Sequence, residues 1–153
     1  MRPAPEIRDL AGQPAAVERA KTDADGLAAT IYRAFPMLFG QLARLGIPPA
    51  GPPFIRYLKT GERFEIELGV PLPEGVGELE GVDQTMLPAG RAAIMRYIGP
   101  YDGLRNACEQ LMAWVDERDE EAAGPHWETY VTDPRTEPDA SKRITEIYLP
   151  LKS

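Results

Sequence analysis

LPAGRAAIMRYIGPYDGL, residues 87–104, is the most informative stretch of the chain, because an earlier segment repeats it. Residues 10–27, LAGQPAAVERAKTDADGL, align with it at an offset of 77 positions, and seven of the eighteen pairs are identical. Two further blocks align in the same order: GPPFIRYL (51–58) with GPHWETYV (124–131) at an offset of 73, and FEIEL (64–68) with TEIYL (145–149) at an offset of 81. This pattern predicts a duplicated unit, and copies this small must share one core.

Within each copy the periodicity changes in the same order, from a strand to a helix and then to two strands. In the second copy, Leu104, Leu111 and Val115 recur at helical spacing on one face, and Asp102 stands where the helix N-cap is expected. In the first copy, Gly46 is a stop signal, and Pro36 predicts a kink or a break in the helix. The predicted strands are residues 15–21, 54–58 and 63–70 in the first copy, and residues 91–98, 127–131 and 144–149 in the second.

We therefore predict an α+β fold and a single domain over residues 1–153. Repeat one occupies about residues 4–71, the linker residues 72–82, and repeat two about residues 83–151. Two tandem strand–helix–strand–strand repeats predict pseudo-two-fold symmetry and an antiparallel sheet of about eight strands, with two helices on one face and a ligand groove on the other. The seam between two related halves is a favourable place for a pocket.

Charge and composition exclude several classes of function. The chain has 153 residues and a formal net charge of −7, and its basic residues are scattered singly, which argues against nucleic acid or an anionic membrane as the main partner. No apolar run approaches the length of a membrane span, and the first residues lack the apolar stretch of a signal peptide. One cysteine excludes an internal disulfide and predicts a cytoplasmic protein.

Alternation along the strands selects a candidate ligand face. Glu128 and Tyr130 point to one side of the segment WETY, and Trp127 points to the other. We expect the helix side to carry Trp127, Phe54, Ile147 and Leu149, and the open side to carry Glu128, Tyr130, Tyr57, Ile55 and Tyr148. Aromatic walls around a carboxylate suit a flat, apolar or cationic ligand. The alternative that stays open is that the tyrosines are ordinary sheet residues and that Glu128 is solvated.

The chain contains one histidine, His126, and one cysteine, Cys108. Their spacing predicts neither a histidine-based catalytic triad nor a metal site, so we expect no metal and no cofactor. We interpret His126 as a residue at a turn or strand edge, and Cys108 as a thiol on the buried helical stripe. Arg19 and Arg96 occupy equivalent places in the two copies, which predicts a structural pairing role.

These motifs resemble the GyrI-like small-molecule-binding family, an effector-binding fold that also forms the C-terminal half of some AraC-type and MerR-type multidrug-responsive regulators. The resemblance spans nearly the whole chain and rests on four segments: LPAGRAAIMRYIGPYDGL (87–104), AGPHWETYVTDP (123–134), TEIYLPL (145–151) and GIPPAGPPFIRYL (46–58). The segments that resemble the family take up the chain and leave no helix-turn-helix domain, so we expect no direct DNA binding.

The resemblance implies a pocket in the groove between the repeats, with an acidic residue at its floor. Glu128 matches that acidic position. In regulatory relatives this glutamate meets the positive charge of lipophilic cationic drugs. Tyr130 and Tyr148 match pocket-wall positions, and Tyr57 is their counterpart in the first copy. With Ile55 and Trp127, these residues form the predicted ligand-binding set.

Three classes of function stay open. The first is a stand-alone module that binds lipophilic aromatic or cationic compounds, for protection against xenobiotics and antibiotics or for sensing them. The second is a hydrolase, since the resemblance implies relatives that open the cyclopropane ring of cyclopropanoid DNA-alkylating compounds; Glu128 would act as general base and Tyr130 would hydrogen-bond the carbonyl that gains charge. The third is a protein-interaction module, such as a DNA gyrase inhibitor, whose partner would be gyrase or a regulator. We favour binding, with hydrolysis second.

Overall fold

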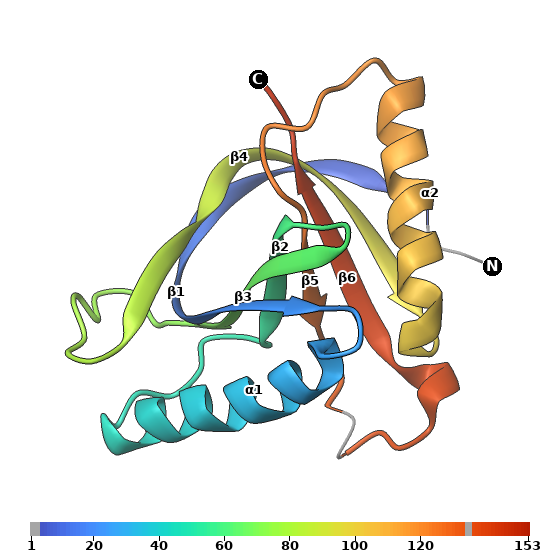
Figure 1. Ribbon diagram of the computed structural model, residues 1–153. Helices are drawn as coiled ribbons and strands as arrows, with labels where there is room; N and C mark the ends of the chain where they lie inside the picture. The colour runs from blue at the N-terminus through green and yellow to red at the C-terminus, as the bar shows by residue number, and fades with distance from the viewer. Residues whose placement is uncertain (1–3, 134–135) are drawn as a thin grey trace. The chain divides into compact units, whose positions relative to one another are not determined.

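A computed structural model describes residues 4–133 and 136–153 of the chain (Figure 1). Within these residues the elements are, in order, β1 (Glu6–Asp23), α1 (Leu27–Arg44), β2 (Phe54–Lys59), β3 (Arg63–Pro71), β4 (Asp83–Ile98), the 3-10 helix η1 (Tyr101–Gly103), α2 (Leu104–Glu117), β5 (Trp127–Tyr130), the 3-10 helix η2 (Ala140–Lys142) and β6 (Ile144–Pro150). The α+β class and the two α-helices are confirmed. In this part of the chain no helix is long and apolar enough to cross a membrane.

The predicted count of about eight strands is wrong, because the described residues form six. The first strand of each repeat is much longer than predicted: β1 has 18 residues and β4 has 16. These two continuous strands take up the length of sequence that additional short strands would need. Pro134, the last residue of the segment AGPHWETYVTDP, lies outside the described residues.

The chain divides into two compact units, and the boundaries between them fall within β1 and β4. We call Gly12–Pro88 the first unit and the remainder the second unit. The strands pair antiparallel in the order β1-β3-β2 in the first unit and β4-β6-β5 in the second. Each unit therefore has the predicted strand–helix–strand–strand order. The pseudo-two-fold symmetry and the organisation as a single domain stay predictions.

In the first unit, α1 packs on the sheet through Leu38 and Leu42, which join Val70 of β3 in one buried cluster. The helix is continuous across Pro36, so the predicted break is wrong. A proline in a helix interior removes one backbone hydrogen bond, and the buried face on either side of Pro36 offsets that loss.

The ends of the two helices follow the sequence signals only in part. Gly46 ends α1 as predicted: its φ is +72°, and the N–H of Ile47 donates to the Leu42 carbonyl at 3.0 Å, which is the hydrogen bond of a Schellman motif. Asp102 is not the N-cap of α2. It lies within η1, and Gly103 takes the cap position without a side-chain hydrogen bond, because the 3-10 turn places one more residue before the helix.

In the second unit, α2 lies alongside β6, as Figure 1 shows, and buries the predicted stripe against the sheet. The stripe on the helix comprises Leu104, Ala107, Leu111 and Val115. Ile147 and Leu149 of β6 meet it, as predicted, together with Ala93 and Met95 of β4. This packing identifies the sheet face that looks toward α2.

An arginine–glutamate pair occupies the same ladder position in each unit. Arg19 lies opposite Glu67 in the first unit, and Arg96 lies opposite Glu146 in the second. Both pairs form ion pairs, which supports the predicted structural role of the two arginines. Glu67 therefore corresponds to Glu146, and not to Tyr148 as the offset of 81 predicts. Alternating apolar residues still match after a shift of two positions, so the sequence similarity did not fix the register.

Candidate functional site

The position of Glu128 follows from the pairing of β5 with β6. Glu128 lies opposite Ile147, and Trp127 lies opposite Tyr148. Residues directly opposite each other in an antiparallel ladder point to the same face. Because Ile147 packs against α2, Glu128 also points toward α2. Its side chain is well buried, with 5% of the residue exposed.

The predicted face is therefore wrong for Trp127, Glu128 and Tyr130. Glu128 and Tyr130 lie on the α2 side, and Trp127 lies on the opposite side with Tyr148, where the two rings stack at 5.2 Å with an angle of 4°. The segment WETY carries an aromatic residue on each face, so alternation alone does not choose between them. The pairing with β6 makes the choice, and that pairing is not visible in the sequence.

Both carboxylate oxygens of Glu128 have neighbours within the second unit. The hydroxyl of Tyr130 donates to Oε2 at 2.8 Å, and the thiol of Cys108 on α2 donates to Oε1 at 3.5 Å. The ring of Tyr101 meets the ring of Tyr130 edge-on, with 5.8 Å between the centroids. The carboxylate is thus held by a phenol on one oxygen and faces a thiol on the other, with aromatic rings nearby.

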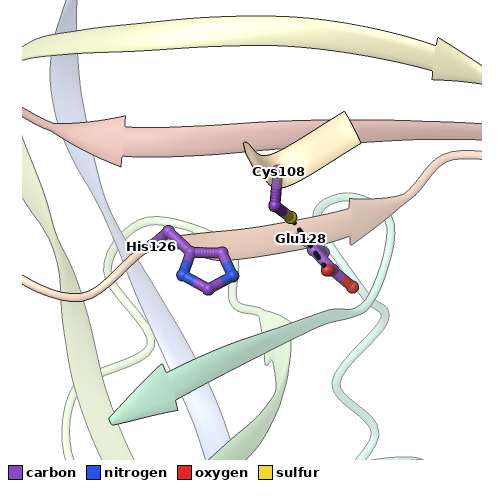
Figure 2. A group of neighbouring side chains, drawn as sticks. All are labelled: Cys108, His126 and Glu128. Carbon is purple, nitrogen blue, oxygen red and sulfur yellow. Dashed lines mark hydrogen bonds between the residues drawn. The ribbon is translucent and has the colours of Figure 1, made fainter. Parts of the chain in front are cut away.

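His126 completes the group, as Figure 2 shows. It immediately precedes β5, two residues before Glu128, and one ligand atom from each of His126, Cys108 and Glu128 lies within 4.8 Å of the other two. The sulfur, nitrogen and oxygen atoms of this group are donors that a metal ion can use. Sequence spacing missed the group because Cys108 reaches it from a different element.

Burial sets the charge state of the thiol and the imidazole. Burial raises the pKa of the Cys108 thiol well above its ordinary value, and the neighbouring Glu128 carboxylate raises it further. The thiol is therefore protonated at neutral pH, which disfavours a nucleophilic role. Cys108 is half-buried beside the stripe and not part of it, so its predicted place on the buried stripe is wrong. Burial lowers the pKa of His126, so the ring is neutral at neutral pH.

The remaining predicted residues are Ile55, Tyr57, Tyr148 and Trp127. Ile55 and Tyr57 belong to the first unit, where Ile55 is buried opposite Leu68 and Tyr57 is half-buried opposite Ile66. Ile66 and Leu68 alternate with Val70, which packs against α1, so Ile55 and Tyr57 point to the α1 side and Phe54 to the other. The predicted face is therefore wrong for these three residues too. The predicted place of Ile55 and Tyr57 in a common pocket with Glu128 stays a prediction, as does the groove between the repeats. Tyr148 shares a face with Trp127, so neither shares the face of Glu128.

An apolar hollow lies at the C-terminal end of α1, lined by Phe39, Leu42, Ala43, Gly46, Ile47, Pro48 and Pro49. None of these lining residues carries a charge or a catalytic group, so the hollow could accept an apolar group but offers no side chain for catalysis or for pairing with an ion. Glu128 is the better candidate because it combines burial, polar contacts and aromatic neighbours. Tyr101 is a member of this site that the sequence interpretation missed, since its segment GPYDG reads only as a turn before a helix.

The arrangement supports two kinds of chemistry. A buried carboxylate is costly unless hydrogen bonds or a positive charge compensate it, so Glu128 is suited to receive a cation. A carboxylate with one oxygen held by a phenol is also suited to take a proton from water through its other oxygen.

Comparison with known proteins identifies the family of the chain. The profile of the GyrI-like small molecule binding domain matches residues 3–152. Among solved structures, the C-terminal domain of EcmrR has a TM-score of 0.84 at 19% identity, over 98% of each chain. The chain spans only 57% of EcmrR in its complex with DNA, with a TM-score of 0.85, 19% identity and 98% of this chain covered.

Two further similar structures are a hydrolase and a protein with a bound cation. A hydrolase from Listeria innocua has a TM-score of 0.69 at 14% identity, with 97% of this chain and 91% of that chain covered. SAV2435, solved with bound tetraphenylphosphonium, has a TM-score of 0.67 at 12% identity, with 98% and 94% covered. At these identities the likeness establishes the fold alone. No curated protein matches the chain. Since the profile covers nearly its whole length, the chain belongs to the GyrI-like small molecule binding domain family.

Proposed function

We propose that this GyrI-like domain binds lipophilic aromatic or cationic small molecules at Glu128, in protection against xenobiotics and antibiotics or in sensing them. The observation that carries the proposal is a buried glutamate, with 5% of the residue exposed, whose carboxylate accepts a hydrogen bond from Tyr130. Family membership supports a small-molecule ligand. The similar structure of SAV2435 with tetraphenylphosphonium supports a cationic one.

The physical argument is electrostatic. A lipophilic cation loses little hydration when it leaves water, and a buried carboxylate gains from its charge because the local dielectric constant is low. The hydrogen bond from Tyr130 holds the carboxylate in one orientation, which lowers the entropy cost of binding. The rings of Tyr101 and Tyr130 offer aromatic surface to a ligand that carries phenyl groups.

Calorimetric titration with tetraphenylphosphonium tests the proposal. We expect Glu128→Gln to lose about 1–3 kcal/mol of binding free energy, or roughly a 5- to 150-fold increase in Kd, because the amide keeps the shape and removes the charge. Glu146→Gln is the matched control. Glu146 also accepts a hydrogen bond from a tyrosine two residues away, Tyr148, and it lies on the opposite face of the same sheet. Equal affinities of the wild type and Glu128→Gln would contradict the proposal.

Hydrolysis of strained electrophiles is a second candidate, favoured by the contact between Tyr130 and Glu128 and by the hydrolase from Listeria innocua among similar structures. In a cyclopropanoid alkylator, water would attack a cyclopropane carbon and give its proton to Glu128. A carbon–oxygen bond forms as the ring carbon–carbon bond breaks. The electron pair moves to the conjugated carbonyl oxygen, which then takes up a proton. A tyrosine hydroxyl near that oxygen would stabilise its developing charge.

Incubation with a cyclopropanoid alkylator followed by mass spectrometry separates the two candidates. Product heavier than the substrate by one water, formed by the wild type and not by Glu128→Gln, would show hydrolysis at Glu128. Unchanged compound that stays bound to the protein would show binding alone.

A further inference from the structure

We propose that Cys108, His126 and Glu128 form a binding site for a transition-metal dication of the zinc type. The inference goes beyond the proposed function, which makes no use of Cys108 or His126. It rests on one geometric fact: a sulfur, a nitrogen and an oxygen ligand atom, one from each residue, all lie within 4.8 Å of one another.

The elements of the second unit bring these atoms together. His126 immediately precedes β5 and Glu128 is the second residue of that strand, and their ligand atoms lie within 4.8 Å of each other. Cys108 lies on α2 and approaches these two side chains from the helix, as Figure 2 shows. Two ligands therefore come from the segment at the start of β5, and the third comes from the packed helix.

The distances fit a tetrahedral ion after a small adjustment. Zinc binds sulfur at about 2.3 Å and nitrogen or oxygen at about 2.0–2.2 Å, which places neighbouring ligand atoms roughly 3.4–3.7 Å apart. The distance of 3.5 Å between Cys108 Sγ and Glu128 Oε1 already meets that requirement. Since no pair exceeds 4.8 Å, closure needs a movement of about 1 Å, which rotation of the imidazole or the carboxylate supplies.

The donor types select the metal. Binding of the ion would displace the proton of the Cys108 thiol, which is released to water. The resulting thiolate and the imidazole favour zinc and similar borderline ions over magnesium and calcium, which prefer oxygen ligands alone. Three protein ligands leave the fourth tetrahedral position to water or to a ligand. Tyr130 donates to Glu128 Oε2 at 2.8 Å and leaves Oε1 directed to the sulfur, so it acts as the outer partner that orients a ligating carboxylate.

One histidine and one cysteine in the chain make the test direct, because both signals are assigned without mutagenesis. Untagged, chelator-treated protein is titrated with Zn²⁺ under reducing conditions. We expect one equivalent to shift the imidazole NMR signals of His126 and to slow alkylation of the Cys108 thiol by roughly tenfold or more. Mg²⁺ at the same concentration should do neither. Co²⁺ should give a sulfur-to-metal charge-transfer band.

Unshifted imidazole signals together with unprotected thiol would overturn the inference on the wild-type protein alone. Cys108→Ala and His126→Ala should each raise the zinc Kd by roughly tenfold or more, and Tyr130→Phe should raise it by about tenfold. If Cys108→Ala and His126→Ala both bound zinc as tightly as the wild type does, the metal would bind elsewhere and the inference would be wrong. Titration of metal-free wild type with tetraphenylphosphonium is a separate measurement, so failure of either proposal is seen independently of the other.

Discussion

Replacing Tyr130 by phenylalanine removes one hydroxyl group and leaves the ring in place. In the wild type that hydroxyl donates to Glu128 Oε2 at 2.8 Å, and the residue that carries the carboxylate is 5% exposed. Water therefore has little access to take the place of the lost donor. The hydroxyl of Tyr148 makes a similar contact on the other face of the sheet, to Glu146 at 3.4 Å, which makes Tyr148→Phe the matched control.

The two substitutions should differ in how much they lower the free energy of unfolding. A hydrogen bond to a buried carboxylate contributes about 1.5–3 kcal/mol, and we expect Tyr130→Phe to lower the free energy of unfolding by that amount. The contact of Tyr148 is long, and Glu146 also pairs with Arg96. We therefore expect Tyr148→Phe to cost less than about 1 kcal/mol.

Urea unfolding of the wild type and the two variants, followed by circular dichroism, measures both values. The difference between the variants should exceed about 1 kcal/mol, with unchanged dependence on urea concentration. Equal costs would refute the reasoning, because they would mean that the contact between Tyr130 and Glu128 stabilises the fold no more than the longer contact between Tyr148 and Glu146. A larger cost for Tyr148→Phe would place the important carboxylate on the other face.

Three further predictions concern the fold. Glu67→Gln should cost about 3 kcal/mol in chemical unfolding, because the 2% exposed carboxylate receives hydrogen bonds from two arginines. Gly69→Ala should cost about 1–3 kcal/mol in the same assay, because a Cβ there would lie 2.2 Å from the Phe54 ring. The hydrogen bond from Arg91 holds the pKa of Glu120 below its ordinary value. A lowered carboxylate pKa gives stability that is complete above the unfolded pKa and is lost as the pH falls through the folded one. The Tm difference between wild type and Arg91→Gln should therefore shrink between about pH 6 and about pH 3.

Each of these has an internal control. Glu146→Gln occupies the ladder position of Glu67 with a more exposed carboxylate, and a cost equal to that of Glu67→Gln would contradict the burial argument. Gly40→Ala, in α1 with no atom near the new methyl group, should stabilise by about 0.5–1 kcal/mol. Loss of stability at Gly40 comparable to that at Gly69 would show that the Phe54 ring is not the cause. A Tm difference for Arg91→Gln that grows on acidification would contradict the sign worked out for Glu120.

Local signals in the sequence predicted most of the elements. The apolar periodicity predicted the buried stripe of α2. The glycine at position 46 predicted the end of α1, and its φ is positive as such a helix end requires. Two failures concern helices, the expected break at Pro36 and Asp102 as the N-cap of α2. The failures of register and of sheet face depend on how strands pair. The register of β3 and β6 slipped by two residues in the alignment, because the apolar alternation is unchanged by such a slip.

In the candidate site, too, local patterns were predicted from the sequence and tertiary contacts were not. Glu128 and Tyr130 share a face because they lie two residues apart, and that part followed from alternation. The identity of that face did not, since it depends on the pairing of Glu128 with Ile147. Cys108 joins the site through the packing of α2, a tertiary contact that no local pattern encodes. The cytoplasmic location and a protein partner such as gyrase stay predictions.

The central claim is that the charge of Glu128 recognises the charge of a ligand. A binding cycle tests it, with wild type and Glu128→Gln each titrated with tetraphenylphosphonium and with the neutral compound triphenylphosphine oxide. The account predicts that the substitution weakens the cation by about 1–3 kcal/mol more than it weakens the neutral compound. Equal effects on the two ligands would show that Glu128 supports the structure of the site and does not interact with the charge of the ligand. That result would contradict the account.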